Sequence, residues 1–183
     1  MSTRSTLTIK TDTTAINFYR HMDGYVAEAG QTLVQLIDKV AANNSWKHPG
    51  VKLAEEILKQ QYEATKHRAA SPIYELTNNP EGHSDREYHY ELDYLSLDGS
   101  LGDLMITVYE WVYGKPDGTI FSGNFMDYKD FVAKEVAVYQ ERVKAHEAKL
   151  AKEKENGCIA NEEQTKRYGR RYGTITAVRS NKL

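Results

Sequence analysis

Residues 86–94, REYHYELDY, constrain the fold more than any other part of this sequence, because two kinds of side chain alternate along them. On one side of an extended chain lie the apolar and aromatic members, Tyr88, Tyr90, Leu92 and Tyr94. On the other side lie the polar ones, Glu87, His89, Glu91 and Asp93. A period of two is typical of a strand with one covered and one wet face. We therefore expect a sheet that helices cover on one face only.

Similar patterns predict the remaining elements. Further strands are expected at residues 5–10, 14–20, 72–76, 103–113 and 119–123, with a hairpin turn at 114–118. Helical periodicity predicts helices at 26–41, 51–67 and 124–155. The fold class is α+β: an antiparallel sheet of four to five strands, two helices on one face and a long C-terminal helix. We expect one domain at 1–155 and a basic tail at 156–183.

The predicted helix at 124–155 carries two rows of residues spaced by seven, Val132, Tyr139 and His146 in one and Val136, Val143 and Leu150 in the other. Two such rows offset by four form a heptad seam. The second half of this helix is too charged to be buried. It either ends in solvent, which the short seam favours, or forms a homodimer with a second copy of the chain.

Several cellular contexts are excluded. No apolar run approaches the roughly 18 residues of a membrane helix, and the first residues lack the apolar run of a signal peptide. The one cysteine, Cys158, makes no internal disulfide and no cysteine-based zinc site. We expect a cytoplasmic protein that contacts no membrane.

The segment YRHMDGY, residues 19–25, links a predicted strand to a predicted helix. Asp23 and Gly24 suit a structural turn, in which glycine relieves the backbone and aspartate accepts from the first helical amides. An arginine beside tyrosines suits a phosphate or a nucleobase. The candidate binding residues are Tyr19, Arg20, His21, Tyr25, His83 and His89. The alternative is a hydrogen-bonded polar corner that fixes the first helix to the hairpin.

Two copies of a His-x-Asp pattern give a second hypothesis. If the two loops meet at one edge of the sheet, His21, Asp23, His83 and Asp85 would form a divalent metal site for a metal-assisted hydrolase. The alternative is that Asp23 serves the turn and His83 is an exposed loop residue. Because the chain has no phosphate loop, dinucleotide fingerprint or nucleophile elbow, no cofactor is expected otherwise.

The charge is unevenly distributed. Residues 164–183 hold six Lys/Arg and no acid in a chain of net charge −2, so the first 163 residues carry −8. The basic residues Lys166, Arg167, Arg170 and Arg171 alternate with tyrosine and glycine, which suits contact with nucleic acid. A basic strand that docks onto the acidic body is the preferred alternative.

Three stretches, MSTRSTLTI, YRHMDGYVAEAG and GHSDREYHYELD, resemble a group of small, mostly uncharacterised phage and bacterial proteins. That group has an N-terminal STR strand, a His-x-Asp-Gly-Tyr-Pro turn and a later GD-x-EY-x-Y strand. The resemblance covers about residues 1–110, with Val26 at the position of the proline and Ser84 at that of the glycine. It implies a phage or mobile-element setting, and hence the host cytoplasm.

The leading hypothesis is a phage-type accessory protein, for host takeover or counter-defence, that binds a host protein or a small nucleotide-like ligand. Its basis is a tyrosine-rich chain, with 13 tyrosines, that has no assembled catalytic motif. The metal-assisted hydrolase and the nucleic-acid-binding tail are the alternatives.

Overall fold

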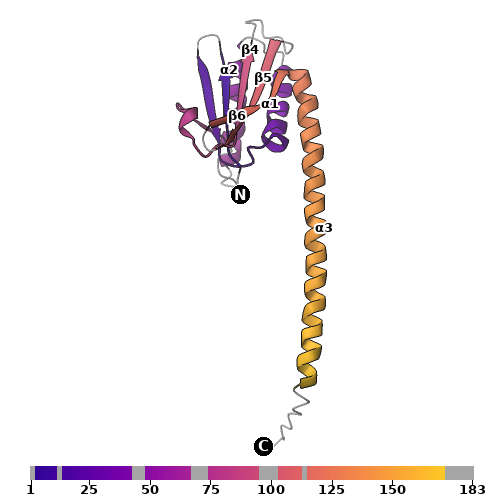
Figure 1. The fold of residues 1–183 in the computed structure, drawn as a ribbon. Coiled ribbons are helices and arrows are strands. Elements are labelled where there is room, and N and C mark those ends of the chain that lie inside the picture. The colour runs from indigo at the N-terminus through magenta and orange to yellow at the C-terminus, as the bar shows by residue number, and fades with distance from the viewer. Residues whose placement is uncertain are drawn as a thin grey trace, which may run out of the picture. The chain divides into compact units, whose positions relative to one another are not determined.

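The computed structural model describes residues 3–11, 14–42, 48–66, 74–94, 103–112 and 115–171, with the backbone alone at 64–65 and 154–171. Its strands are β1 (Ser5–Lys10), β2 (Ala15–Arg20), β3 (Tyr74–Leu76), β4 (Tyr88–Tyr94), β5 (Leu104–Val112) and β6 (Lys115–Asn124). Its helices are η1 (Val26–Gly30), α1 (Gln31–Ala42), α2 (Pro49–Lys66), η2 (Pro80–Gly82) and α3 (Phe125–Arg171) (Figure 1). The α+β class is confirmed.

The six strands form one sheet in the order β3-β2-β1-β4-β5-β6. All neighbours are antiparallel except β1 and β4, which run parallel with Leu7 opposite Tyr90. The expectation of a purely antiparallel sheet of four or five strands is therefore wrong, and the sheet is mixed. Because the chain passes through α1, α2 and β3 between β1 and β4, the connection is long enough to bring a parallel strand alongside.

The side chains that alternate along β4 lie on a buried and an open face, as predicted. Tyr90 and Leu92 are buried in the core cluster, with Tyr88 and Tyr94 packed against it. The cluster also takes side chains from α1 and α2, among them Leu33, Leu36, Leu53 and Ile57. Helices thus cover one face of the sheet, and the opposite face, called here the open face, carries the other side chains of each strand.

The first turns of α3 complete this core. Phe125, Tyr128 and Val132 are buried, and Lys129 donates to the Asp38 carboxylate of α1 over 2.9 Å. The chain divides into two compact units, Met1–Val138 and Tyr139–Leu183. α3 runs through both.

Three predicted boundaries change. The helix expected at 26–41 begins as the π-helix η1 and continues as α1. The turn expected at 114–118 is wrong, because residues 115–118 belong to β6. The long helix continues to Arg171, beyond the expected end at 155.

The two heptad rows of α3 differ in burial along the helix: Val132 is buried and Val136 packs against the core, whereas Tyr139, Val143 and Leu150 are exposed. Dimerisation through them stays a prediction.

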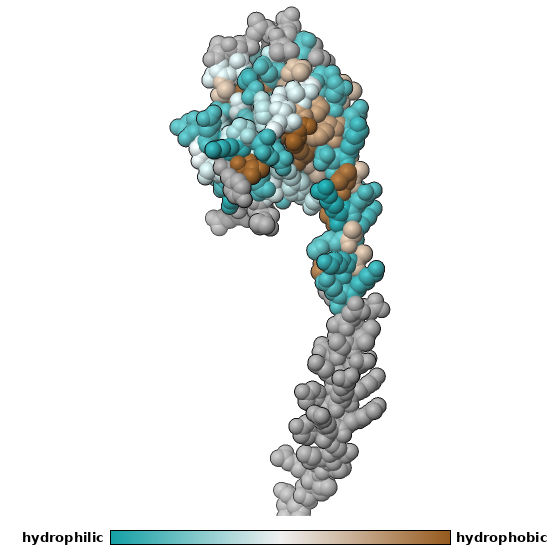
Figure 2. Space-filling model, viewed as in Figure 1, coloured by the Kyte–Doolittle hydropathy of each residue, from teal (hydrophilic) through white to brown (hydrophobic). Residues whose placement is uncertain are grey.

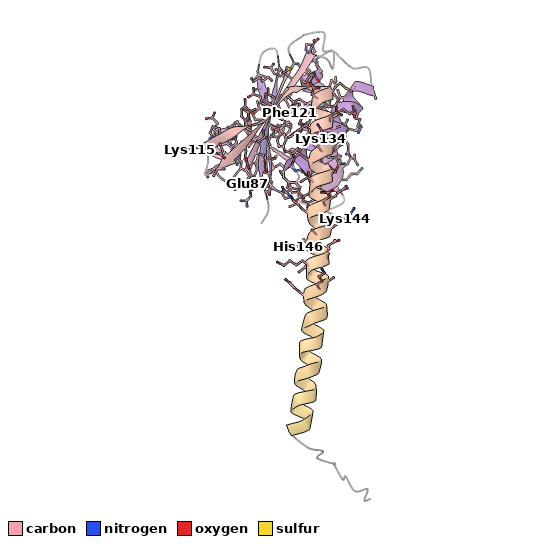
Figure 3. All side chains as sticks on the ribbon, turned by 45° about the vertical axis from the view of Figure 1, so that its right-hand side comes forward. Glu87, Lys115, Phe121, Lys134, Lys144 and His146 are labelled. Carbon is pink, nitrogen blue, oxygen red and sulfur yellow. The ribbon has the colours of Figure 1, made fainter. Side chains whose placement is uncertain are left out.

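Figure 3 shows Lys144 and His146 on the part of α3 that belongs to the second unit, where the described side chains are exposed. Within the described residues, no helix combines the length and the apolar character needed to cross a bilayer.

Candidate functional site

The open face of the sheet holds a groove of about 780 Å³. One wall comes from η2, which packs over β1 and β2, and the opposite wall comes from the β5–β6 hairpin. The lining residues are Thr8, Ala15, Asn17, Pro80, Glu81, Arg86, His89, Glu91, Tyr109, Trp111 and Pro116. This volume lies within the range of small-molecule sites, which is about 300 to 1,000 Å³.

The hairpin wall is anchored to the start of β4. The backbone amide of Trp111 donates to the carbonyl of Glu87 over 2.7 Å. In Figure 3, Glu87 lies near this end of the sheet and Lys115, next to the wall residue Pro116, lies at the outer end of the hairpin. The register between β5 and β6 shifts between Val108 and Tyr109 and again between Glu110 and Trp111. Such irregularities bend a strand and re-aim its side chains.

Arg86 and Trp111 form the closest packed pair of the groove. The guanidinium carbon of Arg86 lies 3.4 Å from the centre of the Trp111 ring, which is a cation–π contact. Arg86 is 3% exposed, and its Nη1 donates to the Pro80 carbonyl and to Thr6 Oγ1. Two donors of this pair, Arg86 Nε and Trp111 Nε1, are buried without an acceptor among the described residues. An unpaired buried donor costs about 1 to 3 kcal/mol, so both are positions where an acceptor would stabilise the protein.

His89 lies on the floor of the groove as a neutral imidazole. Burial, reinforced by the charge of Arg86, lowers the pKa of His89 to about 4. Its Nδ1 lies 2.7 Å from Thr6 Oγ1, the oxygen that also accepts from Arg86. The Thr6 oxygen has two lone pairs, so this contact fits either tautomer of His89; where the Thr6 hydroxyl donates to Nδ1, the imidazole proton is on Nε2. In that tautomer His89 offers an N–H donor to a ligand, and in the other it offers an acceptor.

The aromatic side chains give the groove flat surfaces. The ring of His89 stacks on Tyr109 with centroids 5.8 Å apart and meets Trp111 edge-on at 6.5 Å. On the floor, Thr8 donates to Asn17 Oδ1 over 2.7 Å, which leaves the amide nitrogen of Asn17 without an acceptor among the described residues. Figure 2 shows that the surface in view is mostly teal and white, with brown apolar areas of limited size.

A second cluster of side chains forms around Tyr19 and includes His21, which also belongs to the segment YRHMDGY. The ring of His83 stacks on Tyr19 with centroids 3.9 Å apart, and His21 meets Tyr19 edge-on at 4.7 Å. The Tyr19 hydroxyl donates to Asp85, which also pairs with Arg4 at 2.9 Å. Burial and the Asp85 carboxylate raise the pKa of Tyr19. The two loops therefore meet at the Tyr19 ring.

The metal-site hypothesis stays a prediction, and two of its four residues contact other side chains. The Asp85 carboxylate accepts from the Tyr19 hydroxyl and forms an ion pair with Arg4. His21 Nε2 lies 3.0 Å from the Glu75 carboxylate. Among the residues that the structure describes, no three His, Cys, Asp or Glu side chains come together in a way that could hold a metal ion.

Arg20 and Tyr25, two of the candidate binding residues, lie in the segment that leads from β2 into η1. Arg20 is 5% exposed, and it donates to the Met22 carbonyl and to the Tyr74 hydroxyl on the helix-covered face. Because side chains alternate along β2, Arg20 lies on the face of the sheet opposite to that of Tyr19. Tyr25 is the N-cap residue of η1. The contacts of Arg20 fit the polar corner that was the alternative interpretation, and a binding role for Arg20 and Tyr25 stays a prediction.

The turn itself works differently from the expectation. Asp23, and not Gly24, has the positive φ, 54°. No side chain caps η1, so Asp23 does not accept from the helix. Gly24 is needed because a Cβ there would lie 2.6 Å from the backbone carbon of Arg4.

The predicted nucleic-acid residues Lys166, Arg167, Arg170 and Arg171 lie on helical backbone, and their side chains are outside the described part of the chain. Of the six candidate binding residues, His89 lines the groove and three others, Tyr19, His21 and His83, form the second cluster. Whether any of them binds a partner stays a prediction.

Sequence reasoning missed Arg86, Tyr109 and Trp111. Tyr109 could have been found, because the alternation places it on the same face as His89, with which it pairs in the sheet. Nothing in the sequence indicates that Arg86 stacks on Trp111. No protein-family model, curated protein or solved structure matches the chain.

Proposed function

We propose that the protein acts by binding, and that the groove on the open face of the sheet holds a small planar ligand of the nucleobase or nucleotide-like class. The observation that supports this most directly is the pair of buried donors without acceptors, Arg86 Nε and Trp111 Nε1. Both side chains line the groove, so acceptor atoms on a bound ligand, with a small shift of the stacked pair, would satisfy them.

The shape and polarity of the groove agree with such a ligand. Tyr109 and the half-buried ring of Trp111 offer flat surfaces on which a heterocycle can stack. Asn17 adds a neutral donor, His89 adds a neutral imidazole, and Glu91 adds an acceptor. A nucleobase presents donors and acceptors in one plane, which is the complement of this mixed lining.

The resemblance to phage and bacterial proteins extends the proposal to a biological role. The protein would be a phage-type accessory protein for counter-defence that sequesters a nucleotide-like ligand in the host cytoplasm. A host protein is the alternative occupant of the same face.

The test is calorimetric titration of the whole chain with the four ribonucleosides and their monophosphates. We expect at least one to bind, and Trp111→Phe to weaken it, because phenylalanine keeps a ring but removes the Nε1 donor. Tyr62→Phe on α2, whose side chain is 63% exposed, is the matched control and should bind as the wild type does. If no compound binds at millimolar concentration, or if Trp111→Phe binds unchanged, the proposal is wrong.

A further inference from the structure

We propose that Glu91 determines the specificity of the groove, and that it selects a guanine base that carries at most one phosphate. This inference rests on the proposed function and names the ligand class of the same site. Its basis is the placement of the Glu91 carboxylate, which only accepts hydrogen bonds, on the groove floor beside several donors.

Glu91 lies in the middle of the groove floor. On β4 it pairs in register with Thr8 of β1 and with Thr107 of β5, and its side chain is 26% exposed. One carboxylate oxygen, Oε1, pairs with the ammonium of Lys10 at 2.5 Å. The contact with Glu91 raises the pKa of Lys10. The other oxygen of Glu91 has no partner among the described residues.

The other polar groups of the groove mostly donate. Arg86, Trp111 and Asn17 each carry an N–H group that has no acceptor among the described residues, and His89 carries an Nε2 proton in the tautomer that accepts from Thr6. A carboxylate accepts and never donates. A fitting ligand must therefore turn N–H groups toward Glu91 and oxygen or nitrogen acceptors toward Arg86 and its neighbours.

Guanine meets both requirements. Its N1–H and N2–H₂ are adjacent donors that can bind the two carboxylate oxygens together, and its O6 and N7 are the acceptors that arginine prefers. In adenine the single donor group N6–H₂ is flanked by the acceptors N1 and N7, and in uracil N3–H lies between two carbonyl oxygens. In those bases an acceptor would lie against the Glu91 carboxylate, and the resulting repulsion disfavours them.

The charge of the groove limits the phosphates. Its ionised lining groups are Glu81, Glu91 and Arg86, so the carboxylates outnumber the cation. His89 adds no positive charge near neutral pH, since its pKa is lowered to about 4. Lys10 is already paired with Glu91, and Arg86 is the one cation among the lining groups, so the several charges of a triphosphate would be poorly compensated, whereas a nucleoside or a monophosphate would be tolerated.

The experiment compares guanosine, adenosine, inosine, GMP and GTP by calorimetric titration of the wild-type chain. We expect guanosine to bind about tenfold or more tightly than adenosine, because a bidentate contact discriminates to that extent. Inosine, which lacks the N2 amino group, should bind more weakly than guanosine. GTP should bind more weakly than GMP.

The variant Glu91→Gln keeps the shape of the side chain and should reduce the preference for guanosine to less than threefold. Asp93→Asn is the matched control, because Asp93 also pairs with Lys10, at 3.5 Å, but does not line the groove. It should keep the full preference.

The outcomes separate the two proposals. Equal binding of guanosine and adenosine, equal binding of guanosine and inosine, or an unchanged preference in Glu91→Gln overturns the role of Glu91 but leaves a binding groove. Binding of GTP at least as tight as that of GMP overturns the phosphate limit. If no compound of the panel binds, the proposed function is overturned together with this inference.

Discussion

The close approach at Gly24 allows a quantitative prediction for the substitution Gly24→Ala. Gly24 is buried, its amide donates to the Thr3 carbonyl over 2.9 Å, and its carbonyl accepts from the Tyr90 hydroxyl over 2.8 Å. An added Cβ would lie 2.6 Å from the carbonyl carbon of Arg4, 2.7 Å from the amide nitrogen of Ser5 and 2.9 Å from its Cβ.

The expected cost follows from what surrounds that Cβ. The two nearest atoms belong to the backbone at the start of β1, which cannot rotate away as a flexible side chain would. Either β1 or the turn must shift, and either shift strains the two hydrogen bonds of Gly24. Overpacking of this kind costs about 1 to 3 kcal/mol, and a weakened buried hydrogen bond adds about 1 kcal/mol. We therefore expect Gly24→Ala to lower the free energy of unfolding by about 2 to 4 kcal/mol, and Gly24→Val to lower it further.

The assay is urea unfolding followed by tryptophan fluorescence, which reports on the first unit through Trp111 and is not dominated by the helical signal of α3. Gly118→Ala is the matched control, because a Cβ at Gly118 on β6 would meet nothing within 4 Å. It should change the free energy of unfolding by less than about 0.5 kcal/mol. If Gly24→Ala and Gly118→Ala agree within about 0.5 kcal/mol, the steric argument is refuted.

Three further substitutions test other parts of the structure. The pKa of His89 is 6.5 in the unfolded chain and about 4 in the folded protein, so its stabilising contribution is present above about pH 6.5 and is lost as the pH falls to 4. His89→Gln should remove this loss of stability, which is at most about 3 kcal/mol. If wild type and variant lose the same stability between pH 7.5 and pH 4.5 in urea unfolding, this prediction is contradicted. His21→Ala should change the free energy of unfolding by less than about 0.5 kcal/mol, because the His21 side chain is 40% exposed. If thermal unfolding shows that the variant is not folded, His21 is needed for the fold and this prediction is wrong. Tyr90→Phe should cost about 1 to 2 kcal/mol, because the Gly24 carbonyl loses its buried donor, and a melting temperature equal to that of the wild type would contradict this.

Much of the fold could be predicted because its signals are local. The alternation in β4 separates the buried Tyr90 from the groove residue His89, and no other part of the protein is needed to see it. Helical periodicity likewise locates α1, α2 and α3, since a period of 3.6 is a property of the segment itself. The sequence thus determined the covered and open faces of the sheet and placed His89 and Glu91 on the open one.

Only the tertiary structure decided which segments meet. The parallel pairing of β1 with β4 depends on the path of the chain through two helices, and no local pattern encodes it. The same holds for Arg86 and Trp111, which belong to different segments and come together only because β4 and β5 pair while the η2 loop folds over the open face. Gly24 shows the same distinction: the sequence indicates a turn, but the need for glycine arises from the backbone of Arg4 and Ser5, which local conformational preference cannot reveal.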